Sequence, residues 1–236
     1  MVIALCGQKG GSGKSTVALA IAAELQSRGK RVLLVDADPQ GTARTWGDVA
    51  AEAGHAAPTV VAMGAKMHLP GQLDAVGRAY DVIVIDCPPR HSDVQRSALM
   101  VADLAVLPCR PSPADAWAMT ETVEMVTEAM TLRPALQAFG LITQQRRAAI
   151  GETAREALAQ LGIPVLKVEL GLRAVHSEAM AVGIGVTKHD PDSLAAQEVR
   201  ALVDEVLHHV GRSNGKAKTR TGAAKTPTPA GRSTGD

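Results

Sequence analysis

Residues 7–16 read Gly7-Gln8-Lys9-Gly10-Gly11-Ser12-Gly13-Lys14-Ser15-Thr16. A short apolar run, 2–6, precedes this stretch, and a helical pattern of small and apolar residues follows it. A strand, a glycine-rich loop and a helix in this order are typical of phosphate binding, because glycines let backbone N–H groups approach a polyphosphate closely. The N-terminus of the helix adds its positive dipole end. We predict that Lys14 reaches the β- and γ-phosphates and that the Ser15 hydroxyl holds Mg²⁺.

The loop departs from the standard phosphate-loop spacing in one respect. The pattern G-x-x-x-x-G-K-[ST] requires glycine at position 8, where this chain has Gln8, and a second lysine, Lys9, precedes Lys14. This arrangement resembles the deviant P-loop of the ParA/MinD family of partition and positioning ATPases. The alternative is that Lys9 is a solvated lysine in a mobile loop. The resemblance implies ATP binding by Gly10, Gly11, Ser12, Gly13, Lys14, Ser15 and Thr16.

Apolar runs alternate with helical patterns along the rest of the chain. This alternation predicts an α/β fold, a doubly wound and mostly parallel sheet of the P-loop NTPase type. Strands are expected at 2–6, 31–36, 59–63, 81–86, 104–107, 138–143 and, at an edge, 163–170. Helices are expected at 14–28, 42–53, 71–79, 92–102, 114–130, 149–161, 172–182 and about 193–210. Three prolines in 108–113 predict a stiff loop that continues neither neighbouring element.

Three aspartates follow predicted strands. Asp36 and Asp38 come at the end of the second strand, and Asp86 ends the apolar run 82–85. Open α/β sheets bind ligands at the carboxyl ends of their strands, so we expect these carboxylates beside the phosphate loop. A turn and a helix cap explain one aspartate of the first pair but not both. An apolar run that ends in aspartate is the Walker B pattern, whose carboxylate holds Mg²⁺ through water.

The family resemblance extends to these aspartates, because Cys87-Pro88-Pro89 after Asp86 matches the family's Asp-x-Pro-Pro sequence. It implies that Asp36 and Asp86 act through Mg²⁺ and that Asp38 positions the attacking water. It also implies that Lys9 contacts the phosphates bound by the other subunit of an ATP-dependent homodimer. The residues expected to act in catalysis are therefore Lys9, Lys14 and Asp38.

The resemblance also suggests contacts in the C-terminal half. Residues after the strand at 138–143 contact adenine in the family; here these are Thr143 and Gln144, and the usual asparagine is absent. Arg173 stands in a stretch like the family's Arg-x-x-x-x-Glu-Ala and is the best folded candidate for nonspecific DNA binding. Arg146 and Arg147 are further candidates, and the alternative is that all three are ordinary surface arginines.

Composition divides the chain into a P-loop ATPase domain, 1–211, and a basic tail, 212–236, that we expect to be disordered. The tail carries a net charge of +5, while the whole chain has +1, so the preceding residues sum to −4. Its cations are Arg212, Lys216, Lys218, Arg220, Lys225 and Arg232, opposed by Asp236. DNA affinity of the folded part must therefore come from a local patch. The first strand begins at 2, which leaves no room for a preceding helix-turn-helix module.

Other sequence features narrow the class of protein. Only four residues are aromatic, which argues against a single-strand nucleic-acid platform built on stacked bases. The three cysteines and seven histidines show no metal-binding spacing, and the cysteines are expected to be buried thiols in a reducing compartment. No apolar run approaches 18 residues, so we expect a cytoplasmic protein without a membrane span. The family resemblance implies that it associates with the nucleoid.

These features favour an ATP-dependent molecular switch. By resemblance, ATP and Mg²⁺ stabilise a homodimer that binds double-stranded DNA nonspecifically, and a ParB-like or cargo-adaptor protein stimulates hydrolysis. Such a cycle positions a plasmid, a chromosome region or a protein organelle such as a carboxysome. One alternative is a membrane-cycling ATPase of the MinD type, which needs an amphipathic anchor that the tail lacks. The other is a P-loop biosynthetic ligase, an assignment that Lys9 disfavours.

Overall fold

The computed structural model describes residues 1–146 and 148–221. Its centre is a six-stranded sheet in the order β3-β2-β4-β1-β5-β6, and every neighbouring pair of strands is parallel. The inner strands are continuous apolar runs because helices cover both of their faces. The predicted fold class is confirmed. The strands are β1 (Val2–Leu5), β2 (Val32–Asp36), β3 (Thr59–Ala62), β4 (Val82–Asp86), β5 (Leu104–Cys109) and β6 (Gln137–Ile142).

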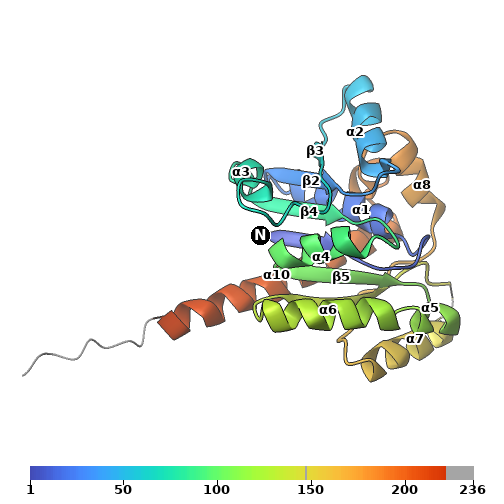
Figure 1. Cartoon of the computed structure of the whole chain (residues 1–236). Helices are drawn as coiled ribbons and strands as arrows, with labels where there is room; N and C mark the ends of the chain where they lie inside the picture. Colours follow the sequence, from blue (N-terminus) through green and yellow to red (C-terminus); the bar gives the residue numbers. More distant parts are fainter. Residues whose placement is uncertain (147, 222–236) are drawn as a thin grey trace, which may run out of the picture.

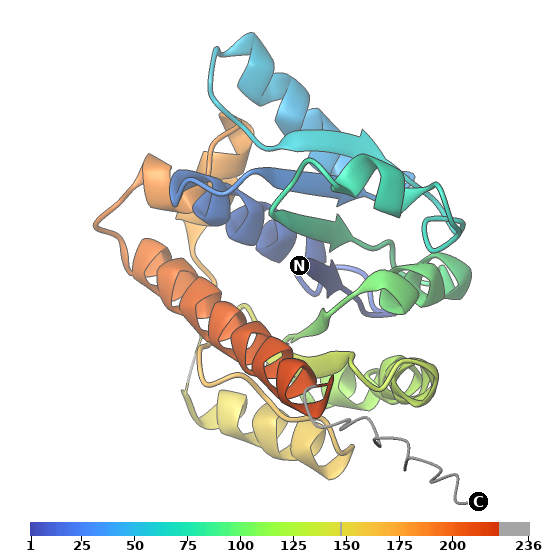
Figure 2. The same ribbon diagram turned by 90° about the vertical axis from the view of Figure 1, so that its left-hand side faces the viewer.

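Two layers of helices enclose the sheet, as Figures 1 and 2 show from perpendicular directions. The first layer consists of α3 (Leu73–Gly77), α4 (Ser92–Val101), α6 (Thr120–Leu132) and α7 (Ala148–Gln160). The second consists of α1 (Lys14–Ser27), α2 (Thr42–Glu52) and α10 (Leu194–Thr221). Three short helices complete the chain: α5 (Pro113–Trp117), α8 (Ala174–Ala181) and α9 (Val186–His189). The free thiols of Cys6, Cys87 and Cys109 are buried in the first layer's core, as predicted.

The segment 163–170 is not the edge strand that the sequence predicts. It follows β6 with only isolated bridges, Gly140 to Val165 and Gln145 to Gly171. Side chains take up the backbone groups that a regular ladder needs: the Glu205 carboxylate accepts from the N–H groups of Lys167 (2.8 Å) and Val168 (3.0 Å). A long-range contact therefore overrides the local strand propensity.

The prediction that Pro108 ends the fifth strand is also wrong, because β5 continues to Cys109. Val106 accepts from Cys6 on the β1 side, whereas Cys109 accepts from Thr143 on the β6 side. Pro108 lies on the β1 side, like Val106, but beyond the end of β1. No described strand lies beside Pro108 there, so its lack of an N–H group costs the sheet no hydrogen bond. Proline is tolerated in edge strands for the same reason.

Two helices differ from their predicted extents more than the others do. The expected helix at 114–130 is divided into α5 and α6, and the Thr120 hydroxyl donates to the Trp117 carbonyl (3.0 Å) at the break. The last helix passes the predicted end at 210 and continues to Thr221, so it includes the first part of the segment expected to be disordered. The rest of that tail lies outside the described residues. No helix within 1–146 and 148–221 has the length and apolarity to cross a membrane.

Candidate functional site

The glycine-rich loop begins where β1 ends, in the middle of the sheet, because β1 lies between β4 and β5. Gly11 and Gly13 have φ values of 73° and 93°, a left-handed conformation that favours glycine. Gly13 immediately precedes α1, so the loop leads directly into the positive end of that helix. The strand, loop and helix expected from the sequence are therefore all present and continuous.

Lys14 is buried within the loop. Its Nζ atom donates a hydrogen bond to the Lys9 carbonyl oxygen at 2.9 Å. Burial lowers the pKa of the ammonium, and the nearby Asp86 carboxylate opposes this change. A charged donor that is largely removed from water interacts strongly with an anion that reaches it, because water does not screen the contact.

Asp36 and Asp86 lie side by side, since they are paired in the register of β2 and β4. Asp36 accepts hydrogen bonds from the backbone N–H groups of Arg44 (2.9 Å) and Asp38 (3.1 Å), which fix its orientation. Asp86 is fully buried, and neither of its carboxylate oxygens has a hydrogen-bond partner among the described residues. Burial raises the pKa of Asp86 to about 7, although the neighbouring Ser15 hydroxyl opposes the rise.

These donors fit a magnesium ion. A buried carboxylate without a hydrogen-bond partner is costly. The nearby Lys14 ammonium offsets only part of this cost, since the pKa of Asp86 stays raised, and a further cation would offset more. No group of three or more His, Cys, Asp or Glu side chains in 1–146 and 148–221 is arranged to hold a metal alone. A magnesium ion beside Ser15, Asp36 and Asp86 would therefore take most of its oxygen ligands from phosphate and water, as this ion commonly does.

Asp38 follows β2 by two residues, and its charge acts on the nearby Lys14 and Asp86. It is half-buried, and its carboxylate accepts from the Gln40 N–H at 2.9 Å in a short turn. With Asp36 and Arg44 it lines a cavity of about 290 Å³. The turn explains why aspartate is favoured at 38, and the cavity leaves the carboxylate accessible to a small polar molecule.

Thr143 and Gln144 contact the loop rather than an open base pocket. The Thr143 hydroxyl donates to the Ser12 carbonyl (2.8 Å), and the Gln144 amide donates to the Gly11 carbonyl (2.8 Å). Gln144 has a φ of 54°, an unusual value for a residue other than glycine. With both carbonyls held from the β6 side, the loop is fixed in one conformation. The adenine contacts expected of these two residues stay a prediction.

This contact yields a test with matched variants. We expect Thr143→Val to weaken nucleotide affinity about tenfold, because it leaves the buried Ser12 carbonyl unpaired, at a typical cost of roughly 1–3 kcal/mol. Thr143→Ser keeps the hydroxyl and should bind as the wild type does. Titration with a fluorescent nucleotide distinguishes the two variants. Equal affinities would show that the hydroxyl does not position the loop.

The Lys9 side chain contacts the short helix α5. Its ammonium forms an ion pair with Asp115 at 2.8 Å, and one third of the side chain is exposed. Arg110 (3.0 Å) and the Ser112 hydroxyl also contact this carboxylate. Although burial alone raises the pKa of Asp115, hydrogen bonds from Lys9, Ser112 and Arg110 keep it below its usual range.

Sequence reasoning missed several residues that support the loop. Asp115 follows Ser112 and Pro113 with the spacing of a helix cap, which was the one available signal. Gln95 is buried; its side chain accepts from the Gly7 N–H (2.9 Å) and donates to the Pro88 carbonyl (2.9 Å), so it joins the start of the loop to the segment after Asp86. No local pattern marks Gln95, since its contact with the loop joins residues 88 positions apart in the sequence.

The arginines expected to bind DNA have different surroundings. Arg173 precedes α8, and its guanidinium contacts the Glu198 carboxylate at 2.6 and 3.1 Å. The same carboxylate accepts from the Gly171 N–H (3.0 Å). Arg146 is exposed, and Arg147 lies outside the described residues.

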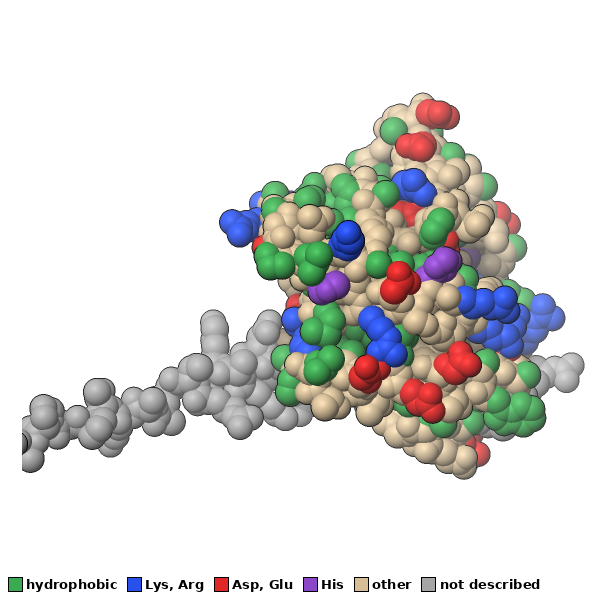
Figure 3. Space-filling model, viewed as in Figure 1, with side chains coloured by type: hydrophobic (Ala, Val, Ile, Leu, Met, Phe, Trp, Pro, Cys, Tyr) green, Lys and Arg blue, Asp and Glu red, His purple; other side chains and the backbone are tan. Residues whose placement is uncertain are grey.

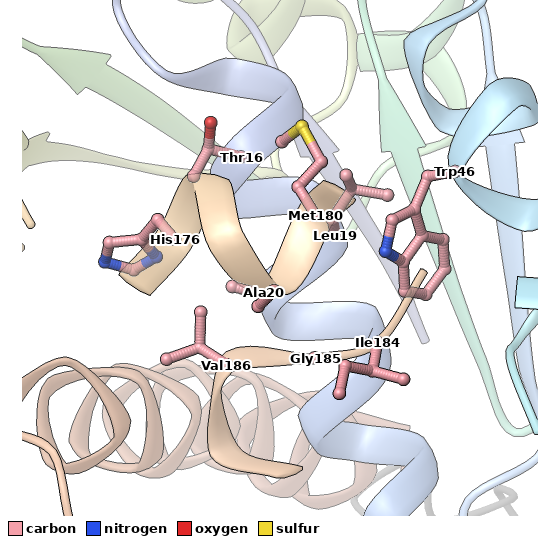
Figure 4. A pocket seen from close by; sticks show the side chains of 10 residues that line it. Thr16, Leu19, Ala20, Trp46, His176, Met180, Ile184, Gly185 and Val186 are labelled. Atoms are coloured by element: carbon pink, nitrogen blue, oxygen red, sulfur yellow. The ribbon is translucent and has the colours of Figure 1, made fainter. Parts of the chain in front are cut away.

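A small pocket lies between α1, α2 and α8 (Figure 4). It is lined by Thr16, Leu19, Trp46, His176 and Met180 among others, and its volume is about 10 Å³. Trp46 Nε1 and His176 Nδ1 are buried there without a hydrogen-bond partner in the described structure. Burial lowers the pKa of His176. The volume suits about one water molecule, so this pocket is too small for a nucleotide.

Three features define the class of protein: a phosphate loop follows the central strand, a buried carboxylate ends the next strand, and the loop contains a second lysine. Together they are typical of a P-loop nucleotide-binding protein with a deviant Walker A motif. The chain belongs to the CobQ/CobB/MinD/ParA nucleotide binding domain family, which matches residues 3–186. The predicted membership of the ParA/MinD ATPases is thereby confirmed.

Individual relatives agree with this family. The chain is 33% identical to the maintenance of carboxysome distribution protein A of Halothiobacillus neapolitanus, over 87% of this chain and 95% of that protein. It is 30% identical to the chromosome-partitioning ATPase Soj of Thermus thermophilus, over 88% and 96%. The structure of MinD from Pyrococcus horikoshii with Mg-ADP shares the fold, with a TM-score of 0.69, 21% identity and coverage of 90% and 98%.

Proposed function

We propose that this protein is an ATP-driven positioning switch. ATP with Mg²⁺ joins two copies through their facing phosphate loops, the dimer binds double-stranded DNA nonspecifically, and a partner protein stimulates hydrolysis and release. The observation that carries the proposal is the position of Lys9. Its ammonium is partly exposed and pairs with Asp115 on α5, whereas Lys14 is buried and donates to the Lys9 carbonyl within the loop.

The proposed chemistry assigns a role to each group of the site. Lys14 and the backbone N–H groups of the loop would neutralise phosphate charge, and Asp36, Asp86 and Ser15 would hold a magnesium ion. The ion would supply further charge neutralisation at the phosphates. Asp38 orients the attacking water from the accessible side of the site. Phosphoryl transfer depends mainly on positioning and electrostatics, so these few groups suffice for slow hydrolysis.

In the proposed cycle, dimerisation and DNA binding both depend on the neutralisation of phosphate charge. Two facing phosphate loops bring two polyphosphates together, and a Lys9 from each side offsets their repulsion. Dimerisation also doubles any cationic patch that contacts DNA, which couples DNA affinity to ATP. Arg173 is the proposed folded contact, although it must exchange its contact with Glu198 for phosphate. The basic segment 212–236 adds affinity in either nucleotide state.

In the proposed cycle, the partner protein determines which cargo is positioned. One relative is named for carboxysome distribution and another for chromosome partitioning, so a single ATPase architecture accompanies different cargoes. A ParB-like or cargo-adaptor protein that binds the ATP dimer would determine which cargo is positioned by this chain.

Substitution of Lys9 tests the proposal. We expect Lys9→Ala to keep nucleotide binding within a few-fold of wild type but to lose ATP-dependent dimerisation, because the repulsion between the two polyphosphates is no longer offset. Sedimentation velocity with a non-hydrolysable ATP analogue and Mg²⁺ measures the dimer, and DNA mobility shifts under the same conditions should show a parallel loss. Lys30→Ala, at an exposed position after α1, is the matched control. An intact Lys9→Ala dimer would refute the proposed switch.

A further inference from the structure

Trp117 is unusually exposed for its size. It ends α5, and 74% of its surface is accessible, the highest value among the large apolar side chains whose exposure the structure describes. The other tryptophan, Trp46, is only 3% exposed. Single exposed apolar residues are common on protein surfaces, so the surroundings of Trp117 must decide whether it has a role.

Those surroundings form a cavity beside the phosphate loop. The cavity has a volume of about 450 Å³, and its lining consists of Gln8, Lys9, Arg90, Trp117, Ala118, Thr120 and Glu121. We call it the Trp117 groove. Lys and Arg side chains also gather near α5 at the right-hand edge of Figure 3. The groove thus combines a large aromatic side chain and an arginine, two residue types that are enriched at protein–protein interfaces, with a lysine and a glutamate.

The groove has features of a site that is held in shape. Gln8 is fixed from two sides, because its backbone N–H donates to the Thr122 hydroxyl (3.1 Å) and its side-chain amide donates to the Ser92 hydroxyl (3.0 Å). Arg90 has a φ of 57°, a left-handed conformation that is uncommon outside glycine and occurs often at functional sites. A fixed wall lowers the entropy cost of binding a partner.

Lys9 indicates which partner fits the Trp117 groove. It lines the groove, and its ion-pair partner Asp115 lies two residues before Trp117 on the same short helix. In the proposed switch, Lys9 is covered by a second copy of this chain. A surface that covers Lys9 also reaches Trp117, since both line one cavity.

The charges in the Trp117 groove also favour a second copy of this chain as its binding partner. Lys9 and Arg90 are cationic and Glu121 is anionic, so the surface carries both signs. A two-fold axis places each patch against its own copy, which requires a self-complementary surface. A partner peptide of one charge would leave one of these signs unpaired.

We propose that the Trp117 groove belongs to the surface through which two ATP-bound copies associate, with Trp117 of each copy buried against the other. The inference rests on the proposed ATP-dependent dimer and extends it to a residue outside the nucleotide site. A tryptophan buries about 150–250 Å² of surface, whereas a stable interface buries roughly 1,600 Å² in total. The two tryptophans therefore act as anchors within a larger contact.

The presence of only two tryptophans makes a direct optical test possible. In Trp46→Phe all tryptophan fluorescence comes from Trp117. We expect strong acrylamide quenching with Mg-ADP and a several-fold smaller quenching constant, with a blue-shifted emission, with Mg²⁺ and a non-hydrolysable ATP analogue. If Trp46→Phe does not fold, the difference between wild type and Trp117→Phe gives the same Trp117 signal.

Substitutions provide the second readout. Trp117→Ala should raise the dimer dissociation constant at least tenfold in sedimentation while leaving nucleotide affinity unchanged, and Trp117→Phe should retain most of the association. Leu132→Ala is the matched control, because Leu132 is 68% exposed at the end of α6 and does not line the groove. A wild-type dimer whose Trp117 stays equally quenchable, and which Trp117→Ala does not weaken, overturns the inference but keeps the proposed function. A wild type that stays monomeric with the ATP analogue overturns both.

Discussion

Lys14→Ala is expected to lower ATP affinity by about 100-fold or more, which corresponds to roughly 3 kcal/mol. The ammonium is buried inside the loop and close to the positive end of α1, so its contact with phosphate is made with little competing water. Alanine removes the charge and leaves the rest of the loop in place. Isothermal titration with Mg-ATP measures the loss, and dimerisation and DNA binding should then show no response to ATP.

A stability measurement separates this effect from misfolding. Burial lowers the pKa of Lys14, which means that the folded protein holds this charge at a cost in the absence of phosphate. The Lys14→Ala protein should therefore melt at or above the wild-type temperature without nucleotide. Wild-type ATP affinity in a folded Lys14→Ala protein would place the phosphates elsewhere and remove the basis of the proposed function.

Asp86→Asn is expected to act in opposite directions on function and on stability. The magnesium-dependent part of ATP affinity and hydrolysis should be lost, because this carboxylate is one of the groups proposed to hold the ion. The protein without nucleotide should become more stable, because a buried carboxylate without a partner is removed. Titrating ATP with and without Mg²⁺, together with thermal melting, measures both effects.

The stability difference should depend on pH in a defined direction. The pKa of Asp86 is about 7 in the folded protein and 3.8 in its unperturbed form, so the folded state retains this proton over the interval between them. The wild type therefore loses stability as pH rises from about 4 to 7, by up to roughly 4 kcal/mol, whereas Asp86→Asn does not. The two proteins should melt alike near pH 4 and differ by on the order of 10 °C above pH 7. Parallel melting curves across this range would contradict the assignment.

The sequence predicted the elements that depend on local pattern. Continuous apolar runs identified the six strands, and the ends of β2 and β4 brought Asp36 and Asp86 together in register, because parallel strands finish at one edge of the sheet. The glycine spacing identified the loop. These signals are strong because each one lies within a few neighbouring residues.

Contacts between distant residues were not predictable in this way. The pairing of Lys9 with Asp115 and the support of the loop by Gln95 depend on how α4 and α5 pack, which no spacing in the sequence reveals. The segment 163–170 has the composition of a strand, but Glu205 on α10 takes up its backbone N–H groups. Local propensity is weak where a side chain from another element offers a better partner.

The interrupted segment along β6 limits how this protein can assemble. A regular outer strand would offer a row of free backbone groups to a neighbouring molecule, which is a route to uncontrolled growth of a sheet from one chain to the next. At 167–168 those groups are already bonded to Glu205, and the opposite edge strand, β3, is only four residues long. We therefore expect larger assemblies to grow through helix surfaces and strand ends, where the proposed nucleotide-dependent contact lies, and not by adding strands to the sheet.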